Sequence, residues 1–229
     1  VMVKDINAAG SSSPTYLTAV GSTLFFVADD GTNGVELWKS DGTSAGTVMV
    51  KDINAAGNSS PTYLTAVGST LFFVANDGTN GAELWSYDTT GASGDPVMVK
   101  NINNAAGGSS LIHVTVVGST LFFQANDGTN GYELWKSAGT MMVTNIRGGA
   151  GHSFPSNFTV VGSTLFFQAN DGTNGYELWK SDGTSAGTMM VTNIRSGNGD
   201  SFPNYGMVVG STLFFVANDG TNGVELWSY

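Results

Sequence analysis

Five copies of one hexapeptide divide this sequence into repeats of similar length. GlySerThrLeuPhePhe begins at glycines spaced 47, 50, 44 and 48 residues apart, namely Gly21, Gly68, Gly118, Gly162 and Gly210. A period of this length restricts the fold to architectures in which one supersecondary unit is repeated in a stack or a ring. The fold is therefore expected to consist of copies of one small unit.

Each repeat contains four short apolar runs separated by turn residues. In the first repeat these runs are residues 16–20, 23–28, 35–40 and 47–53. Their lengths are typical of strands, and they are rich in Val, Thr, Phe, Tyr and Trp. Gly21 and Ser22 predict a two-residue hairpin between the first two strands. Four antiparallel strands in each of five repeats predict an all-β protein, a five-bladed β-propeller.

The two ends of the sequence each match part of a repeat. Residues 1–6 resemble a fourth strand, and residues 225–229 resemble a third strand. We therefore expect a single domain, residues 1–229, in which the N-terminal strand completes the last blade and leaves no open sheet edge. The expected blades are about 14–53, 61–102, 110–146, 155–194, and 203–229 together with 1–6.

Differences among the repeats predict cross-strand pairs. Counting from the hairpins places Val27 opposite Val35, and Glu36 opposite Lys51. The corresponding residues of the next three repeats are Val74, Ala82, Glu83 and Lys100, then Gln124, Tyr132, Glu133 and Thr144, then Gln168, Tyr176, Glu177 and Thr192. The last repeat has Glu225 and no lysine of its own at this place, so we expect Lys4 to pair with Glu225 and join the two ends.

The composition disfavours several classes of function. The absence of Cys excludes a disulfide framework, a thiolate zinc site and a cysteine nucleophile. A net charge of -10 opposes binding to nucleic acid or an anionic membrane, because both depend on Lys and Arg. No apolar run approaches the ~20 residues of a membrane-spanning helix. We expect no nucleic-acid partner, no membrane insertion and no signal peptide in this chain.

Motifs of enzymes are also lacking from the sequence. The two histidines, His113 and His152, lie in the entry loops of different blades, which leaves little for a triad or a metal cluster. There is no Walker loop, and the glycines lie in hairpins. Paired carboxylates would be repeated by symmetry rather than differentiated into acid and base. We therefore expect a protein that is not an enzyme and requires no cofactor.

The AspGlyThrAsnGly segment opens the hypothesis of a calcium site. It begins at Asp30, Asp77, Asp127, Asp171 and Asp219. Asp, Asn and Glu at offsets of zero, three and six supply oxygen ligands of the kind that calcium takes. The alternative is that Asp and Asn bond to the backbone of a tight turn while Glu pairs with Lys across the sheet. The turn is the stronger interpretation, and calcium is retained as an optional ligand.

Aromatic residues recur at fixed places in the repeat. A Trp follows each Glu-Leu pair, at Trp38, Trp85, Trp135, Trp179 and Trp227. Sugar rings stack on such aromatic faces, but a residue that recurs in every blade more often fills the space between sheets. We expect these tryptophans in the core. We also expect Phe25 and Phe26 to point to opposite faces of their strand.

The rim where the second hairpin meets the connection between blades is the expected place for ligand contacts. Its loops are rich in Asn, Asp, Ser and Gly, and the connections differ most among the repeats. The candidate residues are Gln124, Tyr132, Arg147, Gln168, Tyr176 and Arg195. The alternative is that these residues pack together as one blade subtype without a ligand.

The third and fourth strands carry a family resemblance. GluLeuTrpLysSerAspGlyThr occurs at 36–43 and 177–184, and in the first repeat AlaGlyThr and ValMetValLysAspIle follow it. This pattern resembles the ELWxxDGT repeat family of bacterial proteins over nearly the whole chain. Repeats two, three and five depart from the motif in the third hairpin. The resemblance implies a secreted or surface-exposed repeat protein involved in adhesion or recognition.

Two functions remain open at this point. The first is a non-enzymatic binding module that recognises carbohydrate or another extracellular surface ligand, a glycan or a surface protein, through its rim loops. Repeated weak sites would then gain strength from avidity. The second is a structural or protein-interaction scaffold, natural or consensus-designed, with no small-molecule ligand. The fold does not decide between them, because propellers host many functions.

Overall fold

The chain folds entirely into β-strands and loops. The computed structural model describes residues 1–92, 94–104 and 107–229, and within these residues no helix is present. The strands form five antiparallel sheets, which we number as blades one to five along the chain. Contacts divide the chain into two compact units, residues 1–111 and 112–229. The expectation of an all-β, propeller-like repeat fold is confirmed.

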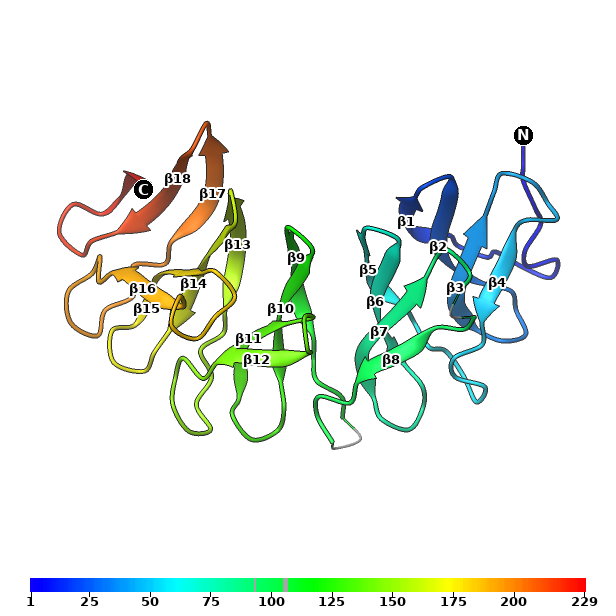
Figure 1. The fold of residues 1–229 in the computed structure, drawn as a ribbon, viewed down its shortest axis with the longest axis horizontal. Helices are drawn as coiled ribbons and strands as arrows, with labels where there is room; N and C mark the ends of the chain where they lie inside the picture. The colour runs from blue at the N-terminus through cyan, green and yellow to red at the C-terminus, as the bar shows by residue number, and fades with distance from the viewer. Residues whose placement is uncertain (93, 105–106) are drawn as a thin grey trace. The chain divides into compact units, whose positions relative to one another are not determined.

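The first unit contains blades one and two (Figure 1). Blade one consists of β1 (Thr15–Val20), β2 (Thr23–Asp29), β3 (Val35–Ser40) and β4 (Val48–Lys51). Blade two consists of β5 (Thr62–Val67), β6 (Thr70–Asn76), β7 (Ala82–Asp88) and β8 (Val97–Lys100). Each strand pairs with the next one along the chain, which makes each blade a meander.

The second unit contains blades three to five. Blade three consists of β9 (Ile112–Val117), β10 (Thr120–Asn126), β11 (Tyr132–Lys136) and β12 (Met141–Thr144). Blade four consists of β13 (Ser156–Val161), β14 (Thr164–Asn170), β15 (Tyr176–Ser181) and β16 (Met189–Thr192). Blade five consists of β17 (Asn204–Val209), β18 (Thr212–Asn218) and β19 (Val224–Ser228).

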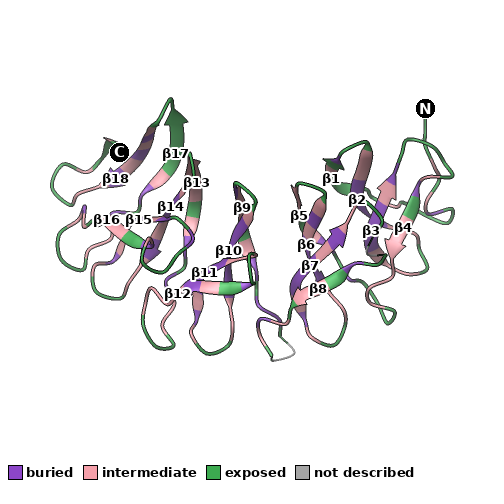
Figure 2. Cartoon of the chain, in the orientation of Figure 1, coloured by how far each residue is buried: buried purple, intermediate pink, exposed green. Residues whose placement is uncertain are grey.

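The first hairpin of each blade is the expected two-residue turn. Val20 pairs with Thr23, and Gly21 has a φ of 58°. Residues with a side chain rarely adopt this left-handed backbone conformation, whereas glycine adopts it readily. In blade one the middle strands β2 and β3 are mostly buried, whereas β1 is mostly exposed (Figure 2). Phe25 and Phe26 are 1% and 5% exposed, which confirms that β2 is buried on both faces.

Apolar clusters lie between neighbouring blades. In the second unit, Leu178 of blade four packs in one cluster with Leu213 and Phe215 of blade five. Four tryptophans are buried, as expected: Trp38, Trp85, Trp135 and Trp179. Trp227 of blade five is half-buried. Sheet-to-sheet packing of the repeated aromatic residues therefore accounts for most of them.

The register differs from the one expected from the sequence. Val27 lies opposite Leu37, and Val35 lies opposite Asp29, because β2 continues to the edge of the second hairpin loop. Lys51 lies opposite Leu37, because an irregularity in β3 and β4 shifts the pairing between Leu37 and Trp38. The same pattern holds in the other complete blades, so Gln124 lies opposite Leu134 and Gln168 opposite Leu178. The predicted Glu–Lys and Gln–Tyr cross-strand pairs are wrong.

The N-terminal residues do not complete blade five. Among the described residues this sheet has three strands, and residues 1–6 form no strand. Lys4 Nζ instead donates a hydrogen bond to the Thr47 carbonyl at 2.7 Å, within the first unit. The structure does not show the predicted Lys4–Glu225 pair, and closure of the sheets into a ring is not shown either. Closure was predicted because the two ends of the sequence resemble strands of one repeat. Such a resemblance in composition does not by itself determine which strands pair.

No helix in the described part of the chain has the length and apolarity needed to cross a bilayer.

Candidate functional site

A buried glutamate links each of the first four blades to the connection that follows it. Glu177 is 0% exposed, and its Oε2 accepts hydrogen bonds from Ile194 N at 2.9 Å and Ser201 Oγ at 2.7 Å. Equivalent bonds are made by Glu36, Glu83 and Glu133. Burial raises the pKa of all four carboxyl groups, and the hydrogen bonds offset part of the increase.

These glutamates replace the Glu–Lys pairs expected from the sequence. Lys51 pairs instead with Asp95 of the second blade's third hairpin, at 2.9 Å, and both side chains are exposed. The repeated acidic group is therefore an element of blade-to-blade structure. All four glutamates are 0% exposed, and their carboxylates accept backbone and hydroxyl hydrogen bonds, so none of them faces a ligand. We assign no catalytic residue to this set.

The connection after each blade lies against the second hairpin of the next one. A Cβ added at Gly172 would come within 3.1 Å of Arg147 Nε, and one at Gly31 within 2.8 Å of Asn7 Oδ1. Arg195 lies in the same way against Gly220. These contacts confirm that the second hairpin and the connection share one edge of the blades. Side chains from both segments therefore form the rim.

Tyr132 is the centre of an aromatic group on this rim. Its ring centroid lies 5.3 Å from that of Phe154, with an interplanar angle of 22°, and 5.2 Å from that of His152. The Tyr132 backbone N–H donates to His152 Nδ1 at 3.1 Å. Arg147 Nη1 donates to the His152 carbonyl at 3.4 Å. The structure thus brings together Tyr132 and Arg147 through the connection between blades three and four.

Tyr176 forms the equivalent group one blade later. It stacks on Phe202 with a centroid distance of 5.7 Å and an angle of 22°, and its N–H donates to Asp200 Oδ1 at 2.8 Å. Arg195 Nη1 donates to the Asp200 carbonyl at 3.3 Å. Burial, followed by the charge of Asp200, raises the pKa of Tyr176, while the charge of Arg147 opposes this increase. Arg147 therefore acts on Tyr176 as well.

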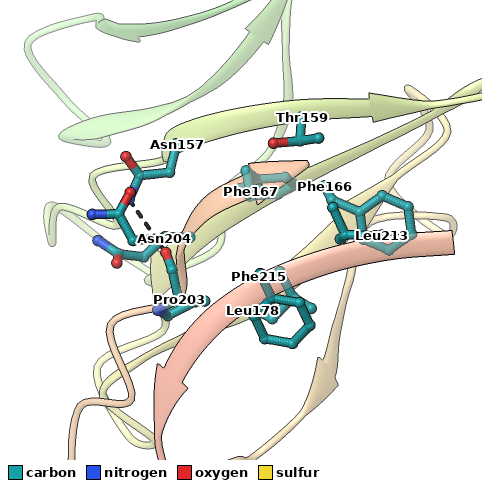
Figure 3. A pocket seen from close by; sticks show the side chains of 11 residues that line it. Asn157, Thr159, Phe166, Phe167, Leu178, Pro203, Asn204, Leu213 and Phe215 are labelled. Carbon is teal, nitrogen blue, oxygen red and sulfur yellow. Dashed lines mark hydrogen bonds between the residues drawn. The ribbon is translucent and has the colours of Figure 1, made fainter. Parts of the chain in front are cut away.

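The two predicted glutamines lie apart from these stacks. Gln124 is 3% exposed. Gln168 Nε2 lies 3.5 Å from Ser156 Oγ, and its side chain lines a cavity between blades four and five. That cavity has a volume of about 10 Å³, and Figure 3 shows that both apolar side chains, such as Phe166 and Leu213, and polar ones, such as Thr159 and Asn204, line it. The hydrogen bond from Asn157 to the Pro203 carbonyl lies at its border. It holds at most a water-sized molecule.

Sequence reasoning missed the phenylalanines that complete the stacks. Phe154 and Phe202 are 37% and 55% exposed, and each has a left-handed φ of 47°. A signal was present in the sequence: a Phe precedes Pro in the two repeats that follow a Tyr, whereas Ser60 follows a repeat with Val35. The two positions vary together because the structure places them side by side.

The loop aspartates are held by their own turns. Asp171 Oδ1 accepts the backbone N–H groups of Thr173 and Asn174, each at 2.8 Å, and its Oδ2 accepts Asn174 Nδ2 at 2.7 Å. Burial pushes the pKa of Asp171 upward, but these hydrogen bonds together bring it below the usual value. The same bonds are made by Asp30, Asp77, Asp127 and Asp219.

The oxygen atoms proposed as calcium ligands are not brought together. The asparagine of the loop accepts a hydrogen bond from the residue after the fourth strand, as in the 2.9 Å bond from Asn193 Nδ2 to Asn174 Oδ1. The glutamate at offset six, Glu177, binds the next connection instead. In the chain as described, no three His, Cys, Asp or Glu residues form a group that fits a metal ion. The geometry is that of an Asx turn.

Comparison with known proteins bears on the fold alone. The sequence matches no model of a protein family and no curated protein. Among solved structures, the chain is similar to a puromycin hydrolase (TM-score 0.52, 14% identity, 93% of this chain and 36% of that chain). It is also similar to a prolyl endopeptidase (TM-score 0.52, 12% identity, 95% and 35%). The chain has a β-propeller-like fold.

A puromycin-hydrolyzing peptidase of Mycobacterium tuberculosis gives a similar result, with a TM-score of 0.50 and 11% identity over 93% of this chain and 37% of that chain. The chain thus spans little more than a third of the length of these peptidases. At such identities the likeness concerns the arrangement of strands. The peptidase activity of those proteins is not transferred to this chain.

Proposed function

We propose that this chain is a non-enzymatic binding module that recognises carbohydrate, or another hydroxylated ligand of an extracellular surface, through the rim of blades three to five. The supporting observation is the pair of exposed, stacked phenylalanines. Phe154 and Phe202 present aromatic surface beside polar groups of Arg147, Arg195 and Asp200. Sugar rings bind to this combination of an apolar face and hydrogen-bonding groups.

The aromatic residues are not required for the junction between blades. Phe202 N donates to the Tyr176 carbonyl at 3.3 Å, and in blade two Ser60 N makes the same bond to the Val35 carbonyl at 3.0 Å. A serine therefore satisfies the backbone at this position. Both residues have a left-handed φ, 46° at Ser60 and 47° at Phe202, so the Phe gains neither a backbone bond nor a more relaxed backbone. A ligand contact gives a reason for the change.

The family resemblance supports an extracellular or cell-surface location with a glycan or a surface protein as partner. We propose no required cofactor, because hydrogen bonds within their own turns already engage the oxygens of the loop aspartates. Calcium remains an optional ligand of those loops, to be tested with chelator. The candidate ligand-binding residues are Tyr132, Arg147, Tyr176 and Arg195, joined by Phe154 and Phe202.

We also propose that the five sheets close into a five-bladed propeller in solution. The support is chemical complementarity: Glu225 corresponds to the four buried glutamates, while Ile6 and Ser12 correspond to the Ile and Ser residues that bind them. In the register of the complete blades, Lys4 would lie opposite Leu226. Closure would cover Leu226, which is 71% exposed.

A glycan array tests the binding function. The labelled protein is applied in calcium and again with chelator. The double variant Tyr176→Val/Phe202→Ser, which copies the residues at the junction of blades one and two, is compared with the control Tyr63→Ser in the other unit. Selective binding that is lost in the double variant and kept in the control supports the proposal. Loss with chelator would assign calcium a role.

The second candidate is a scaffold that binds protein partners or only supports structure. It is favoured by the repeated polar side chains, such as Glu177 and Asp171, that form hydrogen bonds within the protein. An array without signal in both conditions, with working controls, would contradict the carbohydrate proposal. Pull-down with surface proteins would then test the scaffold.

A further inference from the structure

One position in the segment that leads into each blade has a different residue in every copy. It lies between a Gly and a Ser that all five copies share, and its occupants are Ser11, Asn58, Gly108, His152 and Asp200. A single variable side chain in an otherwise constant loop distinguishes one blade from the next without changing the repeat. The position is therefore a candidate for setting which ligand each blade binds.

The side chain at this position is anchored in the same way after blades one, three and four. The backbone N–H of the first residue of the third strand donates to Asn58 Oδ1 at 3.0 Å, to His152 Nδ1 at 3.1 Å and to Asp200 Oδ1 at 2.8 Å. Asparagine, histidine and aspartate therefore satisfy the same backbone donor. They differ in the polar atom that remains.

The remaining atom is a donor at His152 and an acceptor at Asp200. Because His152 Nδ1 accepts the backbone hydrogen bond, the proton of the neutral imidazole lies on Nε2. The second carboxylate oxygen of Asp200, Oδ2, can only accept. Within the described residues neither atom has a hydrogen-bond or ion-pair partner, and both side chains are half-buried. Each atom can therefore contact a ligand.

Both atoms lie in the two aromatic groups of the rim, and the rest of each group is the same. The His152 ring centroid lies 5.1 Å from that of Phe154, and the His152 carbonyl accepts Arg147 Nη1 at 3.4 Å. The Asp200 carbonyl accepts Arg195 Nη1 at 3.3 Å. Each guanidinium has five donors and uses one here. We call these groups the His152 site (Arg147, His152 and Phe154) and the Asp200 site (Arg195, Asp200 and Phe202).

The two sites consequently differ in charge. The His152 site combines a guanidinium with an N–H donor, a pairing that suits a carboxylate. At the Asp200 site the carboxylate of Asp200 offsets the charge of Arg195 and repels a second carboxylate. The net charge of -10 opposes an anion at either site, but salt at 0.15 M screens distant charges beyond about 8 Å. The local groups therefore decide the preference.

We propose that His152 and Asp200 set which class of sugar each site binds, an inference that rests on the carbohydrate function proposed above. The His152 site takes an acidic sugar, whose carboxylate accepts hydrogen bonds from His152 Nε2 and Arg147. The Asp200 site takes a neutral sugar, one hydroxyl of which donates to Asp200 Oδ2. The exposed phenylalanine supplies the apolar face for the sugar ring in both sites.

A glycan array that carries uronic-acid glycans beside their carboxyl-reduced, neutral forms tests the assignment at 0.15 M salt. Phe202→Ser leaves only the His152 site, and Phe154→Ser leaves only the Asp200 site. Both changes copy Ser60, which occupies the equivalent position after blade one. We expect Phe202→Ser to prefer the acidic forms about tenfold and Phe154→Ser to prefer the neutral forms about tenfold, because each preference depends on one hydrogen bond with a charged partner.

Exchange of the variable residue in the Phe202→Ser protein separates its chemistry from its role in the loop. His152→Asp keeps the acceptor for the backbone N–H, as Asp200 does, but replaces the donor by an acceptor, and should abolish the preference for acidic glycans. His152→Asn keeps that acceptor, as Asn58 does, together with an N–H donor, and should retain the preference. Asn58→Asp, the matched control at a junction with Ser60, should change nothing.

The opposite exchange is made in the Phe154→Ser protein. Asp200→Asn removes the negative charge and supplies a donor in its place, so this variant should gain binding to acidic glycans. The two series alter different connections, and if the variants of one fail to fold, those of the other still decide.

The outcomes separate this inference from the function on which it rests. An empty array for the unchanged protein, or binding that persists in Phe154→Ser/Phe202→Ser, would overturn the proposed rim function and this inference with it. The same ratio of acidic to neutral binding in the two single-site variants would overturn the inference alone, and so would a His152→Asp variant that keeps the acidic preference. Loss of all binding in one single-site variant would overturn the assignment of the site that it retains.

Discussion

Glu177 of blade four and Glu225 of blade five occupy the same place in the repeat but have different surroundings. Glu177 is 0% exposed and binds Ile194 and Ser201 of the following connection. Glu225 is exposed. The next residue differs in the same way, since Leu178 is 4% exposed and Leu226 is 71% exposed. One sequence therefore produces a buried interface in one blade and an open surface in the next.

This difference shows that the third strand of each repeat supplies only one side of an interface. The glutamate and leucine of the third strand become buried only when the connection of a following blade covers them. The N-terminal segment already lies on blade one as those connections do: Ser12 O accepts Asp29 N at 3.0 Å, and Ser201 O accepts Asn218 N at 3.0 Å. The second half of the missing interface is thus formed within the first unit.

The largest expected effect comes from truncating the two leucines. Leu178→Ala should lower the free energy of unfolding by about 2 to 5 kcal/mol, as large-to-small changes in a packed core do. If the ring closes as we propose, Leu226→Ala should cost a similar amount. Urea denaturation at low protein concentration measures both. A cost below about 0.5 kcal/mol for Leu226→Ala, the usual range for a surface change, would break the closure proposal.

A pair of double-mutant cycles examines the same interface through its polar groups. Glu177→Gln with Ser201→Ala should show a coupling energy of about 1 to 3 kcal/mol, because the buried carboxylate and hydroxyl bind directly. In a closed ring, Glu225→Gln with Ser12→Ala should show a coupling of the same sign and similar size. Additive effects in the second cycle would mean that Glu225 has no partner in Ser12. Coupling that depends on protein concentration would indicate contact between copies.

Local features of the fold could be predicted from the sequence, and features that depend on a neighbour could not. The five repeats, the Gly21 turn and the burial of Phe25 and Phe26 follow from short-range patterns. The predicted Glu–Lys pairs were wrong because the pairing of β3 with β4 shifts between Leu37 and Trp38, and the sequence gives no sign of that shift. The role of Glu36 depends on Ser59 in the connection to the next blade, and the periodicity of a single repeat does not show this contact.

The candidate site was only partly predicted, because some of its contacts also depend on a neighbouring blade. Tyr132, Arg147, Tyr176 and Arg195 were identified because they differ from the other repeats, and the structure places them on one rim. The glutamines that vary with them lie elsewhere. They lie opposite Leu134 and Leu178, two residues further from the second hairpin than the tyrosines, and the incorrect register had placed them directly opposite the tyrosines. The contacts of the exposed phenylalanines required the connection between blades to be placed in space.

Turn aspartates provide a contrast to the interface residues. Asp171 and Asp219 make the same bonds within their own loops, although one lies in blade four and the other in blade five. Asp171→Ala should therefore lower the free energy of unfolding by about 1 to 2 kcal/mol, and Asp219→Ala should lower it as well, whether or not the ring closes. Thermal or urea unfolding measures the costs. A much larger cost at one site, or a dependence on calcium, would show that the loops do more than stabilise turns.

The smallest expected effect is a pH dependence that separates the two kinds of acidic group. The pKa values of Glu36, Glu83, Glu133 and Glu177 are raised by burial from 4.5, so the folded state binds more protons than the unfolded state just above that pH. The free energy of unfolding should increase as the pH falls from 7 toward 4.5. Below 3.8 it should decrease, because the hydrogen-bonded turn aspartates have lowered pKa values and must take up protons.

Urea unfolding at a series of pH values measures how the free energy of unfolding changes as the pH falls. Glu177→Gln should flatten the increase, since one of the four titrating carboxyl groups is removed, whereas Asp171→Asn should reduce only the decrease at lower pH. A closed ring would bury Glu225 as well, and Glu225→Gln would then flatten the increase to the same extent as Glu177→Gln. A flattened profile in Glu177→Gln beside an unchanged one in Glu225→Gln would show that only the glutamate of blade four is buried, and would count against closure.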